Sequence, residues 1–235
     1  MPTYNNGGTL RDVVERVLVY CADVIVVNDG CTDDSAKILA SFVENVTVVD
    51  YGKNRGKGYA LKQGFKKAKQ MGFNYAITID SDGQHFPEDI PLFVEALEHH
   101  PEALIVGSRN LKQENMPGKN SFANKFSNFW FKIQTGINLP DTQTGYRLYS
   151  LKRLPPIFSA RYEAELSLLV FSAWRGMELV PIKVQVLYPE DRVTHFRPFW
   201  DFFRISVLNT ILCLVAIVYG WPSILIHKLL RRKGV

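Results

Sequence analysis

Two aspartates, Asp80 and Asp82, end an apolar run and are well placed to bind a metal ion. Alternate residues of an extended chain point to the same side, so both carboxylates can face one ligand. Carboxylates this close repel each other unless a cation lies between them, and Mg²⁺ or Mn²⁺ prefers oxygen ligands and also binds phosphate. Gln84 follows two residues later and could supply a third oxygen. The alternative interpretation is a surface turn whose acids cap a helix.

Three further side chains suit a phosphorylated or nucleotide ligand. Asp29 ends a β-branched run, and its carboxylate could accept hydrogen bonds from a base or a ribose, or close an Asx-turn in its own loop. Arg109 and Arg147 offer planar guanidinium groups that match phosphate geometry, although such arginines also serve as salt-bridge partners. The residue types alone leave both interpretations open.

Strand-like and helix-like segments alternate through the first 110 residues. Short apolar or β-branched runs predict strands at 23–27, 46–49, 75–79 and 103–106. Apolar residues at helical spacing predict helices at 9–20, 56–71 and 87–99. This alternation is typical of a Rossmann-like α/β fold, in which a mostly parallel sheet is covered by helices on both faces.

Polar clusters directly follow three of the predicted strands, at 28–30, 80–82 and 107–109. In parallel α/β sheets, ligands bind beyond the carboxyl ends of the strands, so we expect these clusters to meet in one site. The second half of the chain is less regular. We predict helices at 121–135 and 163–175, a strand at 178–187, and a polar segment at 141–147.

The composition predicts a globular protein. Hydrophobic residues make up 46% of the chain and charged residues 22%, which excludes a disordered or polytopic membrane protein. The net charge of +5 suits an anionic membrane, a phosphorylated substrate or nucleic acid. Three cysteines without CxxC spacing favour a reducing compartment. Because the first residues form no signal peptide, we expect the catalytic part in the cytosol.

Six motifs in this order resemble those of family-2 glycosyltransferases of the GT-A fold, and among these the dolichyl- or polyprenyl-phosphate sugar synthases. The motifs lie at 2–6, 26–33, 54–58, 80–85, 107–109 and 141–147. The resemblance runs from Pro2 to about Arg197, and we expect a glycosyltransferase domain at 1–200 and a membrane-associated segment at 201–235. In that family a strand normally leads into the first motif, so we expect either a missing first strand or a misassigned start.

The resemblance implies roles for individual residues. The nucleotide of an activated sugar would contact Pro2, Tyr4, Asn6, Val27, Asp29, Asp80, Ser81 and Arg192. Mg²⁺ or Mn²⁺ would be held by Asp80, Asp82 and Gln84. Arg109 would approach the phosphates, and Arg147 would guide the phosphate of an acceptor.

The implied reaction is a single inverting transfer of a sugar to a lipid-linked acceptor, with the metal offsetting charge on the departing diphosphate. A lipid phosphate is already ionised near neutral pH, whereas a hydroxyl acceptor needs a base, for which Asp141 is the candidate. Asp141 could instead close its own loop. The alternative functions are a catalytically inactive nucleotide-sugar-binding protein, a transferase acting on a hydroxyl of a glycan or glycolipid, and a soluble nucleotidyltransferase.

The segment from Ile205 to Ile226 contains no charged side chain and is long enough to cross a bilayer. Asn209, Thr210 and the break at 220–222 make it a poor uninterrupted span, so an interfacial or re-entrant helix pair is an equal alternative, and a buried core helix is a third. Basic residues on both flanks suit lipid headgroups. We therefore expect partners at the cytoplasmic membrane surface and no nucleic acid; the sequence predicts no oligomeric state.

Overall fold

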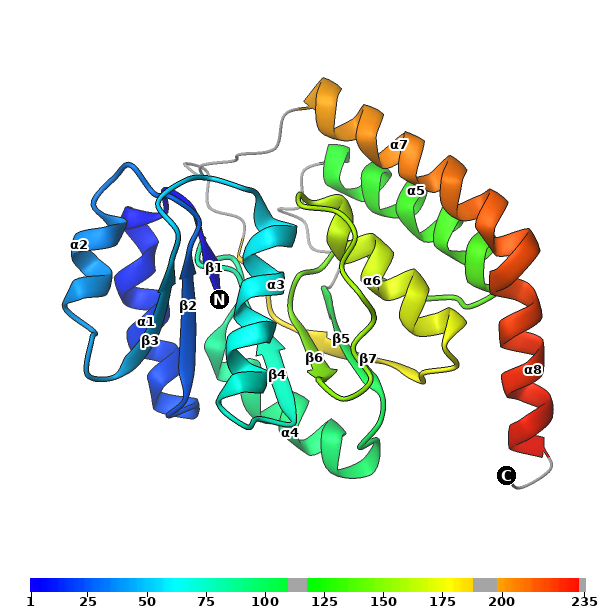
Figure 1. The fold of residues 1–235 in the computed structure, drawn as a ribbon, viewed down its shortest axis with the longest axis horizontal. Coiled ribbons are helices and arrows are strands. Elements are labelled where there is room, and N and C mark those ends of the chain that lie inside the picture. The colour runs from blue at the N-terminus through cyan, green and yellow to red at the C-terminus, as the bar shows by residue number, and fades with distance from the viewer. Residues whose placement is uncertain (110–117, 188–197, 233–235) are drawn as a thin grey trace.

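The computed structural model describes residues 1–109, 118–187 and 198–232, in which helices enclose two groups of strands (Figure 1). The strands are β1 (Pro2–Thr3), β2 (Val24–Asn28), β3 (Val46–Asp50), β4 (Tyr75–Thr78), β5 (Leu104–Arg109), β6 (Arg147–Ser150) and β7 (Leu179–Val184). The helices are α1 (Gly7–Tyr20), α2 (Ser35–Ala40), α3 (Lys57–Gln70), α4 (Ile90–His99), α5 (Gly118–Thr135), α6 (Glu163–Trp174), α7 (Pro198–Val215) and α8 (Trp221–Arg232). A 3-10 turn at Pro87–Asp89 precedes α4, and a π-helical turn at Ala216–Gly220 joins α7 to α8.

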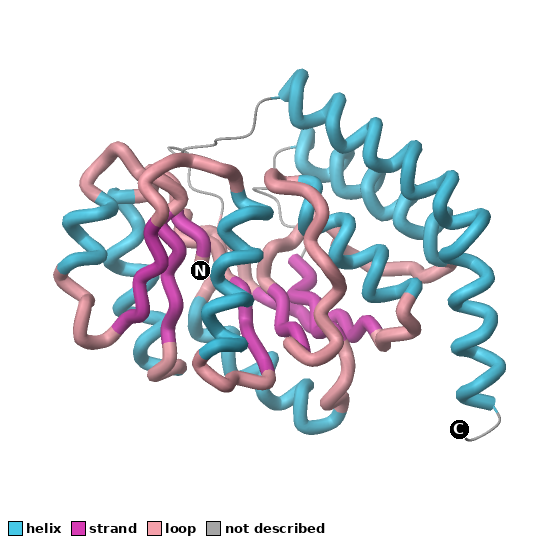
Figure 2. The backbone as a smooth tube through the Cα atoms, in the orientation of Figure 1, coloured by secondary structure: helices cyan, strands magenta, loops and turns pink. Residues whose placement is uncertain are grey.

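The strands form two sheets, which are separate groups in Figure 2. The first sheet has the order β1-β2-β3 and is parallel throughout. The second has the order β4-β6-β5-β7, in which β5 and β7 are parallel and β6 is antiparallel to both of its neighbours. The α/β class with helices on both faces is confirmed. The sequence analysis missed β6, because it begins inside the polar motif at 141–147.

Alternate residues of the strands pack on opposite sides. Val24 and Val26 of β2 belong to a core formed with α1, α2 and α4, whereas Ile25 packs against the core formed by α3, α5, α6 and α7. In the same way, Ile105 of β5 faces the first core, and Leu104 and Val106 face the second. Strands buried on both faces read as continuous apolar runs, which is why these segments were recognisable in the sequence.

The C-terminal helices are docked on the domain along one side. Gln134 Nε2 of α5 donates to Asn209 Oδ1 of α7 at 2.9 Å, and Ser223 Oγ of α8 donates to the carbonyl of Trp174 at 2.6 Å. Gly220 lies so close to the Trp174 ring that a Cβ atom there would overlap the ring. These contacts fix one face of α7 and α8 against α5 and α6. In Figure 1, α7 runs alongside α5.

The opposite face of α7 and α8 is exposed and apolar. Its large side chains, each more than two fifths exposed, recur at helical spacing and include Val207, Ile211, Leu214, Val218, Leu225 and Leu229. Among the described residues, Phe203–Leu230 is the one helical stretch long and apolar enough to cross a membrane, with a mean hydropathy of 1.9. Only 22% of the 18-residue window with this hydropathy is buried inside the structure, so the interpretation as a buried core helix is wrong.

Candidate functional site

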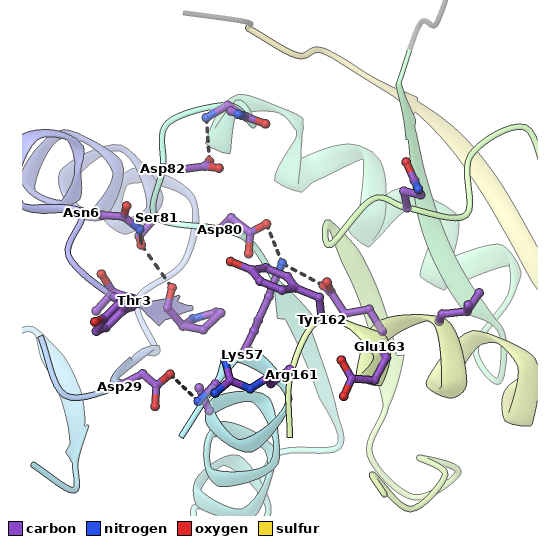
Figure 3. A pocket seen from close by; sticks show the side chains of 18 of the residues that line it. Thr3, Asn6, Asp29, Lys57, Asp80, Ser81, Asp82, Arg161, Tyr162 and Glu163 are labelled. Atoms are coloured by element: carbon purple, nitrogen blue, oxygen red, sulfur yellow. Dashed lines mark hydrogen bonds and ion pairs between the residues drawn. The ribbon is translucent and has the colours of Figure 1, made fainter. Parts of the chain in front are cut away.

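A cavity of about 740 Å³ lies at the carboxyl ends of β1, β2, β4 and β5 (Figure 3). It is lined by all three polar clusters that the sequence analysis singled out, represented by Asp29, Asp80 to Asp82 and Arg109. The expected nucleotide-binding residues Pro2, Tyr4 and Asn6 also line it. The predicted convergence on one edge of the fold therefore produces a single large cavity.

A buried lysine binds the first aspartate of the acidic pair. Lys57 Nζ at the start of α3 lies 2.8 Å from Asp80 Oδ2 and 3.0 Å from Glu165 Oε1 of α6. Burial alone would lower the pKa of Lys57, but the two carboxylates outweigh it and raise that pKa. In turn, Lys57 overcomes the effect of burial on Asp80 and holds its pKa below the usual value. Lys57 and Asp80 therefore both stay charged at neutral pH.

Among the described residues, no cation forms an ion pair with Asp82. Within the same residues its carboxylate accepts one hydrogen bond, from the backbone amide of Gln84 at 3.0 Å. Burial, and then the negative charge of Asp80, raise the pKa of Asp82. An ionised Asp82 is thus an unfavourable charge in the metal-free protein, and a cation beside it would remove that cost.

The turn that contains Asp80, Asp82 and Gln84, called the acidic turn below, fits a hard divalent cation. Asp80, Asp82 and Gln84 line the cavity together and offer only oxygen ligands of the kind that Mg²⁺ and Mn²⁺ prefer. One Asp80 oxygen is taken by Lys57, and no cluster of three His, Cys, Asp or Glu side chains suited to a metal occurs in the described part of the chain. The fit therefore rests on the second Asp80 oxygen, Asp82 and the Gln84 amide.

The N-terminal loop is tied to the acidic turn. Asn6 Nδ2 donates to Ser81 Oγ at 2.8 Å, and this hydroxyl donates to the carbonyl of Pro2 at 3.2 Å. The hydroxyl of Thr9 donates to the Ser81 carbonyl at 2.7 Å. Ser81 is almost fully buried, so in this structure it connects the two loops that carry the expected nucleotide ligands.

Asp29 holds the loop that precedes α3. Its carboxylate accepts hydrogen bonds from the backbone amides of Arg55 and Gly56, both at 2.8 Å, and from the Tyr51 hydroxyl at 2.7 Å. An ionised carboxylate has about four acceptor positions, so one is left for a ligand in the cavity. Asp29 thus holds a loop distant in the sequence rather than closing a turn in its own, and its contact with a nucleotide stays a prediction.

Asp141 is fully buried and bound by nitrogen donors on both oxygens. Arg109 forms a forked ion pair with it through Nε at 2.6 Å and Nη2 at 3.0 Å, and Asn124 Nδ2 donates at 2.6 Å. Burial alone would raise the pKa of Asp141, but Arg109 and the amide of Gln143 hold it below its usual value. A carboxylate with so low a pKa is a poor proton acceptor, and Asp141 does not line the cavity. The geometry supports a role in positioning Arg109, which does line it.

Arg147 is also fully buried and lies outside the cavity lining. Its guanidinium donates to the carbonyls of Glu165 at 2.7 Å and Thr142 at 3.0 Å. These bonds brace the polar motif at 141–147 against α6, so the geometry does not support direct contact with an acceptor phosphate. Arg109 and Arg147 were both predicted to suit phosphate, but they occupy different environments. Arg109 is the last residue of β5 and lines the cavity, whereas Arg147 is the first residue of β6 and does not.

Val27, another expected residue, is buried in β2 and does not line the cavity. Arg192 lies outside the described residues. The sequence analysis also missed several lining residues, namely Lys57, Arg161, Tyr162, Glu163 and Glu165 (Figure 3). Lys57 stands within the motif at 54–58, but its buried charge partners come from distant segments, and the segment at 161–165 carries no recognisable motif.

Sequence comparisons identify proteins similar to this chain. The family model described as "Glycosyl transferase family 2" matches residues 1–154. The chain is 27% identical over 213 residues to a UDP-N-acetylglucosamine–dolichyl-phosphate N-acetylglucosaminyltransferase of Methanococcus voltae, which covers 81% of this chain and 85% of the relative. It is 31% identical over 170 residues to an undecaprenyl-phosphate mannosyltransferase of Micrococcus luteus, with 67% of each chain covered.

Solved structures show the same fold. Glucosyl-3-phosphoglycerate synthase from Mycobacterium tuberculosis, in complex with Mn²⁺, UDP-glucose and phosphoglyceric acid, superposes with a TM-score of 0.65. The match covers 92% of this chain and 77% of that one at 19% identity. Mannosyl-3-phosphoglycerate synthase from Rubrobacter xylanophilus gives a TM-score of 0.61 over 99% of this chain and 73% of that one, at 17% identity. At such identities the likeness shows the fold alone.

Removing the Asp141 carboxylate is expected to destabilise the protein strongly. Asp141→Ala leaves the Arg109 charge and the Asn124 amide without their buried partner, which costs about 3 kcal/mol of unfolding free energy. Urea denaturation measures this loss. The matched control is Glu102→Ala, which breaks the more exposed pair with Arg153 and is expected to cost less than about 1 kcal/mol. Equal losses in the two variants would contradict the positioning role.

Removing the charge of Asp82 is expected to stabilise the metal-free protein. Because the folded-state pKa of Asp82 is raised, its ionisation costs folding free energy above that pKa, and the cost disappears as the pH falls below the unfolded value of about 3.9. In EDTA, Asp82→Asn should therefore melt above wild type near neutral pH, and the two should converge near pH 4.

Metal addition provides the second part of this test. Mn²⁺ should raise the melting temperature of the wild type and leave that of Asp82→Asn unchanged. Asp12→Asn, a substitution on the exposed face of α1, serves as the control and should respond as the wild type does. An equal Mn²⁺ response in the wild type and Asp82→Asn would place the metal elsewhere.

Proposed function

The chain belongs to glycosyl transferase family 2, as its motifs predicted, and from this premise we propose a specific reaction for this glycosyltransferase. It transfers a sugar from a nucleotide-sugar donor to a polyprenyl-phosphate or dolichyl-phosphate acceptor at the cytoplasmic face of a membrane. The observation that carries this proposal is the state of Asp141, whose carboxylate is occupied by Arg109, Asn124 and Gln143.

The cavity suits a nucleotide-sugar donor. Its volume of about 740 Å³ is in the range of sites for ligands of that size. Asp29 has an acceptor position left for the nucleoside, and Tyr4 and Asn6 line the same wall. The relative from Methanococcus voltae is named for a UDP-sugar donor, and the structural neighbour from Mycobacterium tuberculosis binds UDP-glucose with Mn²⁺.

The acidic turn would hold Mg²⁺ or Mn²⁺ through Asp80, Asp82 and Gln84. When bound, such an ion supplies Lewis-acid stabilisation of charge on the diphosphate leaving group. Lys57 keeps Asp80 ionised and so preserves a ligand. Arg109, fixed by Asp141, lines the cavity and would approach the phosphates of the donor.

An ionised acceptor needs no general base, which agrees with the position of Asp141 outside the cavity lining. A lipid phosphate attacks as an anion and needs no proton acceptor, whereas a hydroxyl would need a base that Asp141 is badly suited to provide. Attack opposite the departing diphosphate inverts the anomeric centre. The names of the two sequence relatives described above include dolichyl phosphate and undecaprenyl phosphate, which supports this choice of acceptor.

The apolar face of α7 and α8 would bring the cavity to the lipid. One side of these helices is held on the domain by Asn209 and Ser223, so we propose that they lie in the membrane interface with their exposed side in the lipid. Ile205 of α7 and Ser127 of α5 line the cavity, which therefore reaches the same helices. The free cysteines Cys21, Cys31 and Cys213 suit the reducing cytoplasm.

The acceptor assignment predicts a difference between two matched lipids. Purified protein with Mn²⁺ and radiolabelled UDP-N-acetylglucosamine, UDP-glucose or GDP-mannose should label polyprenyl phosphate in vesicles and leave polyprenol unlabelled. Asp82→Asn should reduce transfer at least about 100-fold through loss of metal binding, whereas the surface variant Asp12→Asn should retain it. Labelling of polyprenol would identify a hydroxyl acceptor, and labelling of neither lipid with any donor would contradict the proposed reaction.

The membrane assignment predicts that charges on the apolar face prevent binding. The double substitution Leu214→Asp and Val218→Asp should weaken sedimentation with phosphatidylglycerol vesicles at least about tenfold, because it replaces two of the exposed apolar side chains. The control carries Val19→Asp and Val43→Asp, which are similarly exposed but lie outside α7 and α8, and should bind as the wild type does. Equal binding of the two double variants would contradict the interfacial orientation.

A further inference from the structure

One wall of the large cavity has no role in the proposed reaction so far. It is formed by Arg161, Tyr162 and Glu163, which stand directly before and at the start of α6, and we call these three residues the α6 entry. Lys57 binds Asp80 of the acidic turn and also the first turn of α6. In Figure 3 the α6 entry and Asp82 accordingly lie on opposite sides of the Lys57 ammonium group.

The α6 entry is held against the start of α3. The amide of Tyr59 donates to the carbonyl of Ala160 at 3.0 Å. Gly58 packs so closely there that a Cβ atom would overlap the backbone of Ser159 and Ala160. The side chains of the entry are therefore presented to the cavity from a backbone that α3 positions, which is what selective binding of a ligand requires.

The carboxylate of Glu163 forms no hydrogen bond and no ion pair within the described residues. It does not cap α6. The amide of Ala164 already donates to the carbonyl of Arg161 at 3.1 Å, and the amide of Glu165 donates to the carbonyl of Tyr162 at 3.3 Å. An ionised carboxylate has about four acceptor positions, so those of Glu163 are open to a ligand in the cavity.

The charges of the α6 entry match the parts of a nucleotide sugar. Arg161 also forms no ion pair within the described residues, and Figure 3 shows it on the side of Asp29, the expected nucleoside ligand. A guanidinium group in this place suits the diphosphate. Glu163 lies on the side away from Asp29. A carboxylate repels phosphate but accepts hydrogen bonds from hydroxyl groups, and the sugar is the hydroxyl-rich part of the donor beyond the diphosphate.

We propose that Glu163 selects the transferred sugar by accepting hydrogen bonds from two adjacent hydroxyl groups of a hexose. This inference rests on the proposed function and deepens it at the donor site. The two oxygens of one carboxylate match a pair of neighbouring hydroxyl groups. A site built to bind hydroxyl groups strongly rejects an analogue that lacks one of them, because the site's polar atom is then left unpaired.

A comparison of donors with nucleoside diphosphates isolates the sugar contact. Isothermal titration in Mn²⁺ identifies which of UDP-N-acetylglucosamine, UDP-glucose and GDP-mannose the wild type binds. Glu163→Ala should weaken binding of that donor at least about tenfold and change binding of its nucleoside diphosphate less than about twofold. Glu95→Ala removes an exposed carboxylate of α4 and should bind both ligands as the wild type does.

Each outcome of this titration decides between the two proposals. Equal losses for the donor and its diphosphate in Glu163→Ala, or no loss for either, would overturn the role of Glu163 and leave the proposed function standing. A wild type that binds none of the three donors would contradict the proposed function itself.

Monodeoxy analogues of the bound donor locate the contact. In the wild type, removal of either of two adjacent hydroxyl groups should weaken binding at least about fivefold, whereas Glu163→Ala should bind these analogues and the parent donor nearly equally. Equal losses in the two proteins for every analogue would show that another side chain holds the hydroxyl groups, and would overturn the proposal.

A conservative variant separates sugar recognition from a role as proton acceptor. Glu163→Gln keeps one acceptor oxygen and should retain donor binding, and transfer to polyprenyl phosphate, to within about fivefold of the wild type. If Glu163 were instead a base, transfer would be lost in Glu163→Gln and Glu163→Ala alike, with donor binding intact in both. That result would overturn the proposal.

Discussion

The buried ammonium group of Lys57 is the contact on which the active cavity depends. It joins the start of α3 to the turn after β4, through Asp80, and to the first turn of α6, through Glu165. Without a cation between them these two carboxylates would repel each other, and the loss of one member of a buried pair costs about 3–5 kcal/mol. Asp29 fixes the preceding loop, so α3 is held at its N-terminal end from two sides.

Lys57 forms ion pairs with Asp80 and Glu165, and in the described part of the chain no ion pair with Asp82 occurs. Asp82 lies beside Asp80 with a raised pKa and, in the described part of the chain, without a paired cation, at a cost in stability that a protein selected for stability alone would avoid. Such uncompensated charge is useful at a site that handles a metal and a diphosphate, because the ion brings the missing positive charge when it binds. Lys57 thus offsets the charge of its two carboxylate partners only in part, and the acidic turn keeps a negative charge that a bound cation would balance.

In the proposed reaction, the position of the cavity would link sugar transfer to the membrane. α7 contributes Ile205 to the cavity wall and an apolar stripe to the surface, while Gln134 and Asn209 hold it on α5. This polar contact is buried and fixes the rotation of α7 about its axis. The stripe could be recognised in the sequence as an uncharged segment, but its orientation depends on this contact.

The sequence by itself determined the alternation of strands and helices and the points where polar clusters follow strands, because both are set by residues close together in the chain. It did not determine what each polar group binds. Asp141 was the candidate base for a hydroxyl acceptor or else a loop-closing acid, but Arg109 and Asn124 occupy its carboxylate. Lys57 was not predicted as a site residue although it connects three segments of the site. A side chain's charge state and role depend on its neighbours in space, and only tertiary structure brings such distant segments together.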